Sequence, residues 1–227
     1  MPGLYMYKFS SFNYSLRWDM LKFFYPAVIY LILVCAPGCN TPSSQEIDIS
    51  AFGRKSDTLI QNVSAHLNEN TRLLDEKQRY DSSLRLQSLL NGVEGLEIRI
   101  LLDQYYEQEL YVFKYNQSKA SGKYFSTRMG YEKGNDSIYL IKERLISPST
   151  GWVSFFDKLK ELTINELPDQ SELEGFEFEV CSRGVLIELA TNNYYKSVQY
   201  CLDNPSVENT IQHQAVVEFL DILRKEF

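Results

Sequence analysis

Residues 96–115 read LEIRILLDQYYEQELYVFKY, and this stretch decides the fold. In its first half, apolar side chains recur at every second position from Leu96 to Leu102, which is the pattern of a half-buried strand. Residues 109–115 are aromatic and β-branched, which favours a second strand. The stretch therefore predicts two neighbouring strands of a sheet.

The pattern continues beyond this stretch. Residues 116–122 and 132–136 are polar and contain glycine, as turns do, and they separate further strands at 123–131 and 137–146. Strands joined by such short connections pair antiparallel. We therefore expect an antiparallel β-meander.

The C-terminal part predicts two helices and three more strands. Ser147 and Pro148 are suited to open a helix, whose apolar side is formed by Trp152, Phe155, Phe156, Leu159 and Leu162. Strands are predicted at 176–181, 185–190 and 194–202, with Asn192 and Asn193 as a tight turn. Asn204, Pro205 and Ser206 are expected to cap a final helix, in which Val207, Ile211, Ala215, Phe219, Leu223 and Phe227 keep a four-residue step. The expected fold class is α+β, an antiparallel meander sheet packed by two amphipathic helices at 93–227.

Two segments precede this domain. Residues 39–56 are rich in Ser, Thr and Gln, which indicates a flexible tether. Residues 57–92 show leucines at helical spacing among many charges, which predicts one or two amphipathic helices that end at Asn91 and Gly92.

The N-terminus resembles an export signal. Phe23 to Ala36 is an uncharged, mostly apolar run just after Lys22, too short for the about 20 residues that a spanning helix needs. A basic start, a short apolar stretch and a small-residue boundary are the layout of a signal peptide, here residues 1–38. Met20 also begins a compact signal, so it is an alternative start.

Ala36-Pro37-Gly38-Cys39 resembles the lipobox of bacterial lipoproteins. The resemblance implies that Cys39 is acylated, for example with palmitate, and becomes the first residue of the mature chain. Pro37 departs from the usual pattern. The chain would then be lipid-anchored in the outer membrane and face the periplasm or the cell surface. An uncleaved N-terminus and a secretory signal without lipid are the alternatives.

Residues 151–227 resemble small uncharacterised lipoproteins of Bacteroidota. The similarity lies in GWVSFFDKL, LPDQSELEGF, VLIELATNNYYKSVQY and EFLDILRKEF, and it extends more weakly back to GLEIRILL. It implies the fold and the compartment of that family. It implies no activity and no catalytic residue.

The composition and the motif content of the sequence exclude several classes of partner and site. The 227-residue chain carries a formal net charge of -7, which argues against a nucleic-acid partner. HExxH, GxGxxG and Walker-type motifs do not occur in the sequence, and we predict no cofactor and no metal. His66 and His213 have no nucleophile and acid arranged beside them in sequence, so both are interpreted as surface or packing residues.

Cys181 and Cys201 form the candidate disulfide. If 176–181, 185–190 and 194–202 form three successive strands, the two cysteines lie two strands apart, about 9.5 Å, which is too far for a bridge. A bridge becomes possible if 176–183 is a loop over the sheet edge. A disulfide and two separate buried thiols are both open.

Two features are candidate partner surfaces. Residues 166–179 hold six acids and no base, which suits a solvated acidic loop or contact with a basic partner through Glu172 and Glu174. Tyr111, Phe113 and Tyr115 share one strand face. If the two C-terminal helices cover the other face, these rings form an amphipathic protein-binding surface, unless the predicted helices of 57–91 cover them.

We therefore expect a non-catalytic, membrane-anchored lipoprotein that binds a protein partner in the cell envelope, such as an inhibitor or immunity-type module. The alternative is an envelope hydrolase that uses a pair of carboxylates, which leaves no spacing signature in a sequence.

Overall fold

A computed structural model describes residues 46–53, 60–62, 71–104, 107–132, 135–177 and 181–227. The predicted signal peptide, Cys39 and His66 lie outside these residues. Within the described part, no helix has the length and apolar character needed to cross a bilayer.

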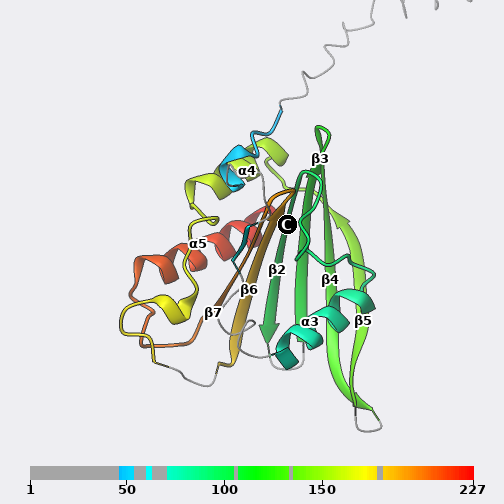
Figure 1. The fold of residues 1–227 in the computed structure, drawn as a ribbon, viewed down its shortest axis with the longest axis vertical. Coiled ribbons are helices and arrows are strands. Elements are labelled where there is room, and N and C mark those ends of the chain that lie inside the picture. Colours follow the sequence, from blue (N-terminus) through cyan, green and yellow to red (C-terminus); the bar gives the residue numbers. More distant parts are fainter. Residues whose placement is uncertain (1–45, 54–59, 63–70, 105–106, 133–134, 178–180) are drawn as a thin grey trace, which may run out of the picture. The chain divides into compact units, whose positions relative to one another are not determined.

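The described residues form a seven-stranded sheet in the order β1-β7-β6-β2-β3-β4-β5 (Figure 1). The strands are β1 Ile60–Asn62, β2 Leu96–Gln104, β3 Glu107–Asn116, β4 Lys119–Glu132, β5 Asn135–Ile146, β6 Arg183–Thr191 and β7 Tyr194–Cys201. The helices are α3 Thr71–Ser83, α4 Trp152–Glu161 and α5 Ile211–Glu226, with 3-10 turns η1 Ser50–Phe52 and η2 Gln170–Glu172. Every neighbouring pair of strands is antiparallel except β1 and β7, which are parallel. The predicted α+β fold with a β2 to β5 meander is confirmed.

The two faces of the sheet are covered by different helices. Phe113 on β3 is fully buried against Phe155 of α4, with 4.9 Å between ring centroids, and it stacks on Phe227 at 5.2 Å. On the opposite face, Tyr80 and Leu84 pack with Val112 of β3. The sheet is therefore enclosed by α4 and α5 on one side and by α3 on the other (Figure 1).

The connection between β3 and β4 is tighter than predicted. Gln117 and Ser118 alone separate the strands, with φ of 47° and 65°. Positive φ at both central positions is the mark of the turn that matches the twist of a hairpin. Most of the polar stretch 116–122 therefore belongs to β4. Asn192 and Asn193 separate β6 from β7, as predicted.

The tether prediction for 39–56 is wrong at its described end. Ile47 and Phe52 are buried in the main core, and the Ile47 amide donates to the Tyr115 hydroxyl at 3.1 Å. Phe52 meets Phe156 edge to face, 6.1 Å between centroids. Two apolar residues in a polar stretch are enough to attach it to the core.

The helical prediction for 57–92 is partly wrong. Ile60–Asn62 is a strand that pairs with β7, and α3 ends at Ser83 rather than at Asn91. The following residues form a loop that turns back at Gly92, where φ is 74°, and that buries Leu89 completely. Leu84 and Leu89, two of the leucines in this range, are buried and anchor the loop.

Both predicted helix starts lie too early. α4 begins at Trp152 after Gly151, whose φ is 86°, so Ser147 and Pro148 belong to the approach. α5 begins at Ile211, and the Thr210 hydroxyl accepts from the His213 amide at 3.2 Å. The Asn204 side chain instead accepts from the Ser206 amide at 2.9 Å, which closes a local turn before the helix.

The four-residue step predicted for the last helix lies on its buried side except at Ile211. Phe219 and Leu223 are buried and Ala215 packs against the core, whereas Ile211 is 76% exposed. Val216 and Leu220, which the step leaves out, are buried as well. A step of four residues advances about 40° too far per turn on an α-helix, so a strict step moves around the axis.

Candidate functional site

A buried ionic network lies between α3 and the sheet. Arg99 on β2 is 1% exposed. Its guanidinium pairs with Glu97 at 2.8 Å and with Asp81 of α3 at 3.0 Å, and it donates to the Gln87 carbonyl at 2.6 Å. One cation thereby links a strand, a helix and the loop between them.

Lys77 of α3 extends the network to β6. Its ammonium group lies 2.7 Å from Asp81 and 2.9 Å from Glu188. Glu188 also accepts from the Tyr195 hydroxyl of β7 at 2.7 Å. Burial opposes the charge on Lys77, but Glu188 and Asp81 outweigh it and raise the Lys77 pKa. Burial and the nearby Glu188 raise the pKa of Tyr195.

The network is balanced in charge. Lys114 pairs with Glu97 at 2.8 Å, so three acids (Asp81, Glu97 and Glu188) face three bases (Lys77, Arg99 and Lys114). A buried charge is tolerated when it is paired in this way. The Lys77 ammonium group holds Asp81 and Glu188 together beneath α3. This arrangement attaches the helix to the sheet.

The sequence holds a weak signal for this network, although the predictions above do not include it. Glu97 and Arg99 lie two residues apart and therefore on one face of β2, where their charges are opposite. Glu188 interrupts the apolar run VLIELA. An acid inside a buried strand requires a cation near it.

The predicted aromatic partner surface is wrong. Tyr111, Phe113 and Tyr115 are all buried, in the core formed with α4 and α5. The two amphipathic helices cover the face that carries these rings, and α3 covers the opposite face with Leu110 and Val112.

The acidic segment is mixed. Glu172 and Glu174 are exposed, in agreement with a solvated loop. Asp169 is buried, where its carboxylate accepts from the amides of Ser171 at 3.1 Å and Gln199 at 3.0 Å. That acid fixes the loop to β7.

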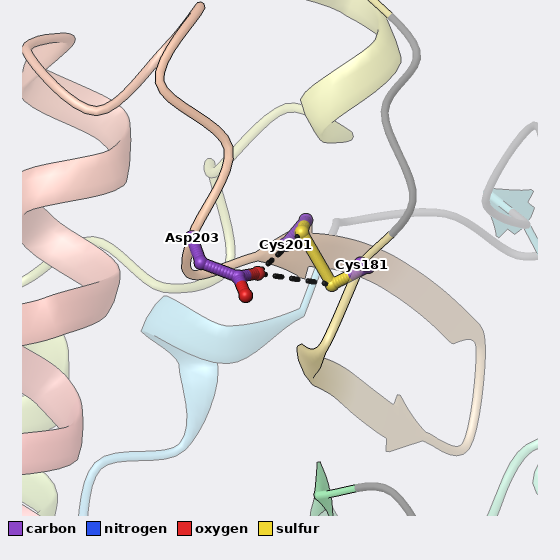
Figure 2. A group of neighbouring side chains, drawn as sticks. All are labelled: Cys181, Cys201 and Asp203. Carbon is purple, nitrogen blue, oxygen red and sulfur yellow. Dashed lines mark hydrogen bonds between the residues drawn. A yellow bond between two sulfur atoms is a disulfide. The ribbon is translucent and has the colours of Figure 1, made fainter.

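The structure joins Cys181 and Cys201 in a disulfide, with 5.5 Å between their Cα atoms. The prediction of a strand at 176–181 is wrong at its described residues, Phe176, Glu177 and Cys181. Because β6 begins only at Arg183, Cys181 lies at the end of a strand next to β7, where a bridge can reach. Asp203 lies beside both sulfur atoms (Figure 2).

His213 is a packing residue, 4% exposed at the start of α5. Its Nε2 atom is buried and has no hydrogen-bond partner within the described part of the chain.

Two shallow surface cavities lie away from the ionic network. Trp152, Asp157 and Lys158 line a cavity of about 590 Å³, and His213 lines another of about 520 Å³. None of the buried network residues lines either cavity.

Most of the large exposed hydrophobic side chains in the described part of the chain lie on the edge strand β5. Along β5, Tyr139, Leu140, Ile141 and Leu145 are large and exposed, Ile141 by 60% and Leu145 by 79%. β5 has β4 as its only neighbour in the described sheet. The register of β4 and β5 shifts between Ser126 and Thr127, whose Cα partners are Lys142 and Leu140, so the extra residue is Ile141 of β5.

Comparison with protein-family models and with curated proteins finds no match for this chain.

Proposed function

We propose that this chain is a non-catalytic lipoprotein of the bacterial envelope that binds an extended polypeptide along the free edge of β5. The observation that carries the proposal is the exposed apolar sequence of this edge strand. An edge strand offers unpaired backbone N–H and C=O groups, and exposed side chains beside them supply specificity for an added strand.

The mixture of charged and apolar residues on β5 favours a specific partner over indiscriminate strand pairing. Charged residues on an edge discourage indiscriminate pairing, and here Glu143 pairs with Lys123 at 2.8 Å while Arg144 lies over the Tyr124 ring at 4.8 Å. The apolar residues around them remain exposed. This combination favours a partner with matching apolar side chains, such as a protein that an inhibitor or immunity-type module masks.

Two observations support the compartment. A disulfide between Cys181 and Cys201 is typical of chains that fold in an oxidising environment. The lipobox-like residues before Cys39 provide an anchor, and acyl chains hold a protein to a bilayer by about 0.8 kcal/mol for each buried methylene. The proposed place is the outer membrane, facing the periplasm or the cell surface.

The anchor is tested by intact mass. We expect a membrane-associated chain that starts at Cys39 and carries added acyl mass. Cys39→Ala should abolish that mass and release the chain from the membrane fraction. A full-length, unmodified chain in the cytosol would contradict the proposal.

The binding edge is tested by photo-crosslinking in cells. A crosslinking residue placed at Ile141 should capture one partner stoichiometrically, and the double variant I141K/L145K should abolish capture from a neighbouring β5 position. Ile211 is the matched control, because it is an exposed isoleucine on α5, 76% exposed against 60% for Ile141. Equal capture from both positions, or none from β5, would contradict a docking edge.

A further inference from the structure

Cys181, Cys201 and Asp203 are brought together by the paired ends of β6 and β7. Cys181 precedes β6, Cys201 is the last residue of β7, and Asp203 follows it. Gly184 and Cys201 are register partners, and the Leu202 amide donates to the Arg183 carbonyl at 2.9 Å. The three side chains therefore extend from a backbone that the sheet fixes.

Asp203 is directed at the sulfur atoms. The Ser182 hydroxyl donates to one carboxylate oxygen and holds the side chain in place. The other oxygen, Oδ1, lies 3.0 Å from Sγ of Cys201 and 3.7 Å from Sγ of Cys181 (Figure 2).

The 5.5 Å between the Cα atoms of Cys181 and Cys201 suits a bridge, whereas the position of the Asp203 carboxylate suits free thiols. Neither sulfur of a disulfide carries a hydrogen, so Oδ1 of Asp203 receives no hydrogen bond from Cys181 or Cys201 while they are joined. Two thiols can both donate to it. A cation can replace both protons.

We propose that, once the disulfide is reduced, Cys181, Cys201 and Asp203 form a binding site for a thiophilic divalent cation of the Zn²⁺ class. Two thiolates and a carboxylate are accepted zinc ligands, and water completes the four positions. The three ligand atoms already lie within 4.8 Å of one another. Tetrahedral zinc with Zn–S bonds of about 2.3 Å separates two sulfurs by about 3.8 Å, so rotation of the cysteine side chains is sufficient.

The reduction step requires an external dithiol. The dithiol gives two electrons and two protons, the Cys181–Cys201 bond breaks to two thiols, and the reductant becomes its own disulfide. The cation then displaces the two thiol protons to solvent. Bridge and metal are therefore mutually exclusive states of one site. The inference does not depend on the β5 contact.

The experiment uses the full chain with Cys35→Ser and Cys39→Ser, so that Cys181 and Cys201 are its only cysteines. A phosphine reduces the bridge without adding metal-binding thiols, and Co²⁺ is the probe. We expect one Co²⁺ per reduced chain, with thiolate-to-cobalt charge-transfer absorption, release of two protons and displacement by Zn²⁺. The oxidised chain should show no such absorption.

Variants distinguish coordination of the cation by Asp203 and Cys201 from general attraction of the cation by acidic residues. Asp203→Asn should weaken Co²⁺ binding by about tenfold or more, the low end of the loss seen when even an outer-shell partner is removed. Glu174→Gln, in the nearby acidic segment, should leave affinity unchanged, and Cys201→Ser should abolish the charge-transfer absorption. Circular dichroism checks that each reduced variant is folded.

Three outcomes would overturn the inference. The reduced chain could remain folded and fail to bind Co²⁺, in which case the bridge is a structural crosslink only. The oxidised chain could bind equally well. Asp203→Asn could bind as tightly as the parent, which would remove the carboxylate from the site.

Discussion

Arg99 is the residue on which the buried network most depends. Substitution of Arg99 by Met keeps an apolar stem but leaves Asp81 and Glu97 with one fewer cation beneath α3. Breaking a buried pair costs about 3–5 kcal/mol, and we expect a loss of this size in the free energy of unfolding, measured by urea denaturation.

Arg128→Ala is the matched control for that measurement. Arg128 pairs with Glu107 at 2.7 Å, but both side chains are exposed. An exposed pair contributes about 1 kcal/mol or less. Equal losses for the two arginine variants would mean that the network around Arg99 is not held away from solvent.

Glu226 gives the protein a defined acid sensitivity. Burial opposes its ionisation, but Lys158 at 2.6 Å, Thr150 and Ser149 lower its pKa from 4.5 to about 2. The folded state therefore favours the carboxylate, and that stabilisation is present above pH 4.5 and lost as pH falls toward 2.

The prediction concerns the difference between the parent and Glu226→Gln. The difference in unfolding free energy should be constant near neutral pH and should shrink between pH 4.5 and 2. Urea denaturation across this range measures it. A difference that grows on acidification would contradict the assigned contacts.

At the scale of elements, the entry into β2 depends on Gly95. Its φ is 80°, and a Cβ there would lie 2.1 Å from the Tyr115 carbonyl oxygen of β3. Gly95→Ala should therefore destabilise through both backbone strain and overlap. Gly151, with φ of 86° and open space around it, is the control for strain alone.

We expect Gly151→Ala to cost about 1–3 kcal/mol, because its φ of 86° and ψ of 158° form a backbone conformation that is essentially confined to glycine. Gly95→Ala should cost at least about 1 kcal/mol more, in the range of overpacked sites. Thermal unfolding of both variants tests this. Equal costs would show that β3 moves away from the added methyl group freely.

The elements also show where sequence periodicity succeeds and where it fails. The alternation from Leu96 to Leu102 predicts β2 correctly because the two faces of the strand differ in chemistry. One face packs in the apolar core, and the other carries Glu97 and Arg99 into the ionic network beneath α3. The alternation at 176–181 is of the same kind, but its described residues Phe176, Glu177 and Cys181 lie outside any strand. Side chains fix this part of the chain, for example the Asn204 side-chain amide, which donates to the Glu177 carbonyl at 3.0 Å. Such long-range polar contacts have no local period.

The candidate site was predictable only in part. The number of cysteines in a chain that the sequence predicts to be exported points to Cys181 and Cys201, but no pattern points to Asp203, because its position beside them depends on the register of β6 and β7. Arg99 and Lys77 were also missed, since pairing across α3 and the sheet joins positions far apart in sequence.

For the whole molecule, the burial of Ile47 and Phe52 limits the length of the tether between the proposed lipid anchor at Cys39 and the domain. If Cys39 is acylated, only residues 40–46 separate the anchor from the core, and an extended chain gains at most about 3.5 Å per residue. Seven residues reach about 25 Å. The domain would then remain close to the bilayer, and a partner of β5 would have to meet it there.

Phe52→Ala tests whether this segment belongs to the domain. Phe52 is fully buried against Phe156, and truncation of a buried phenylalanine costs about 3–5 kcal/mol. We expect a loss of this size in urea denaturation, whereas Val217→Ala, at an exposed position on α5, should stay within about 0.5 kcal/mol of the parent. A small effect of Phe52→Ala would mean that the segment is not part of the core. The tether would then extend past residue 53, and its length would no longer restrict where the domain meets a partner.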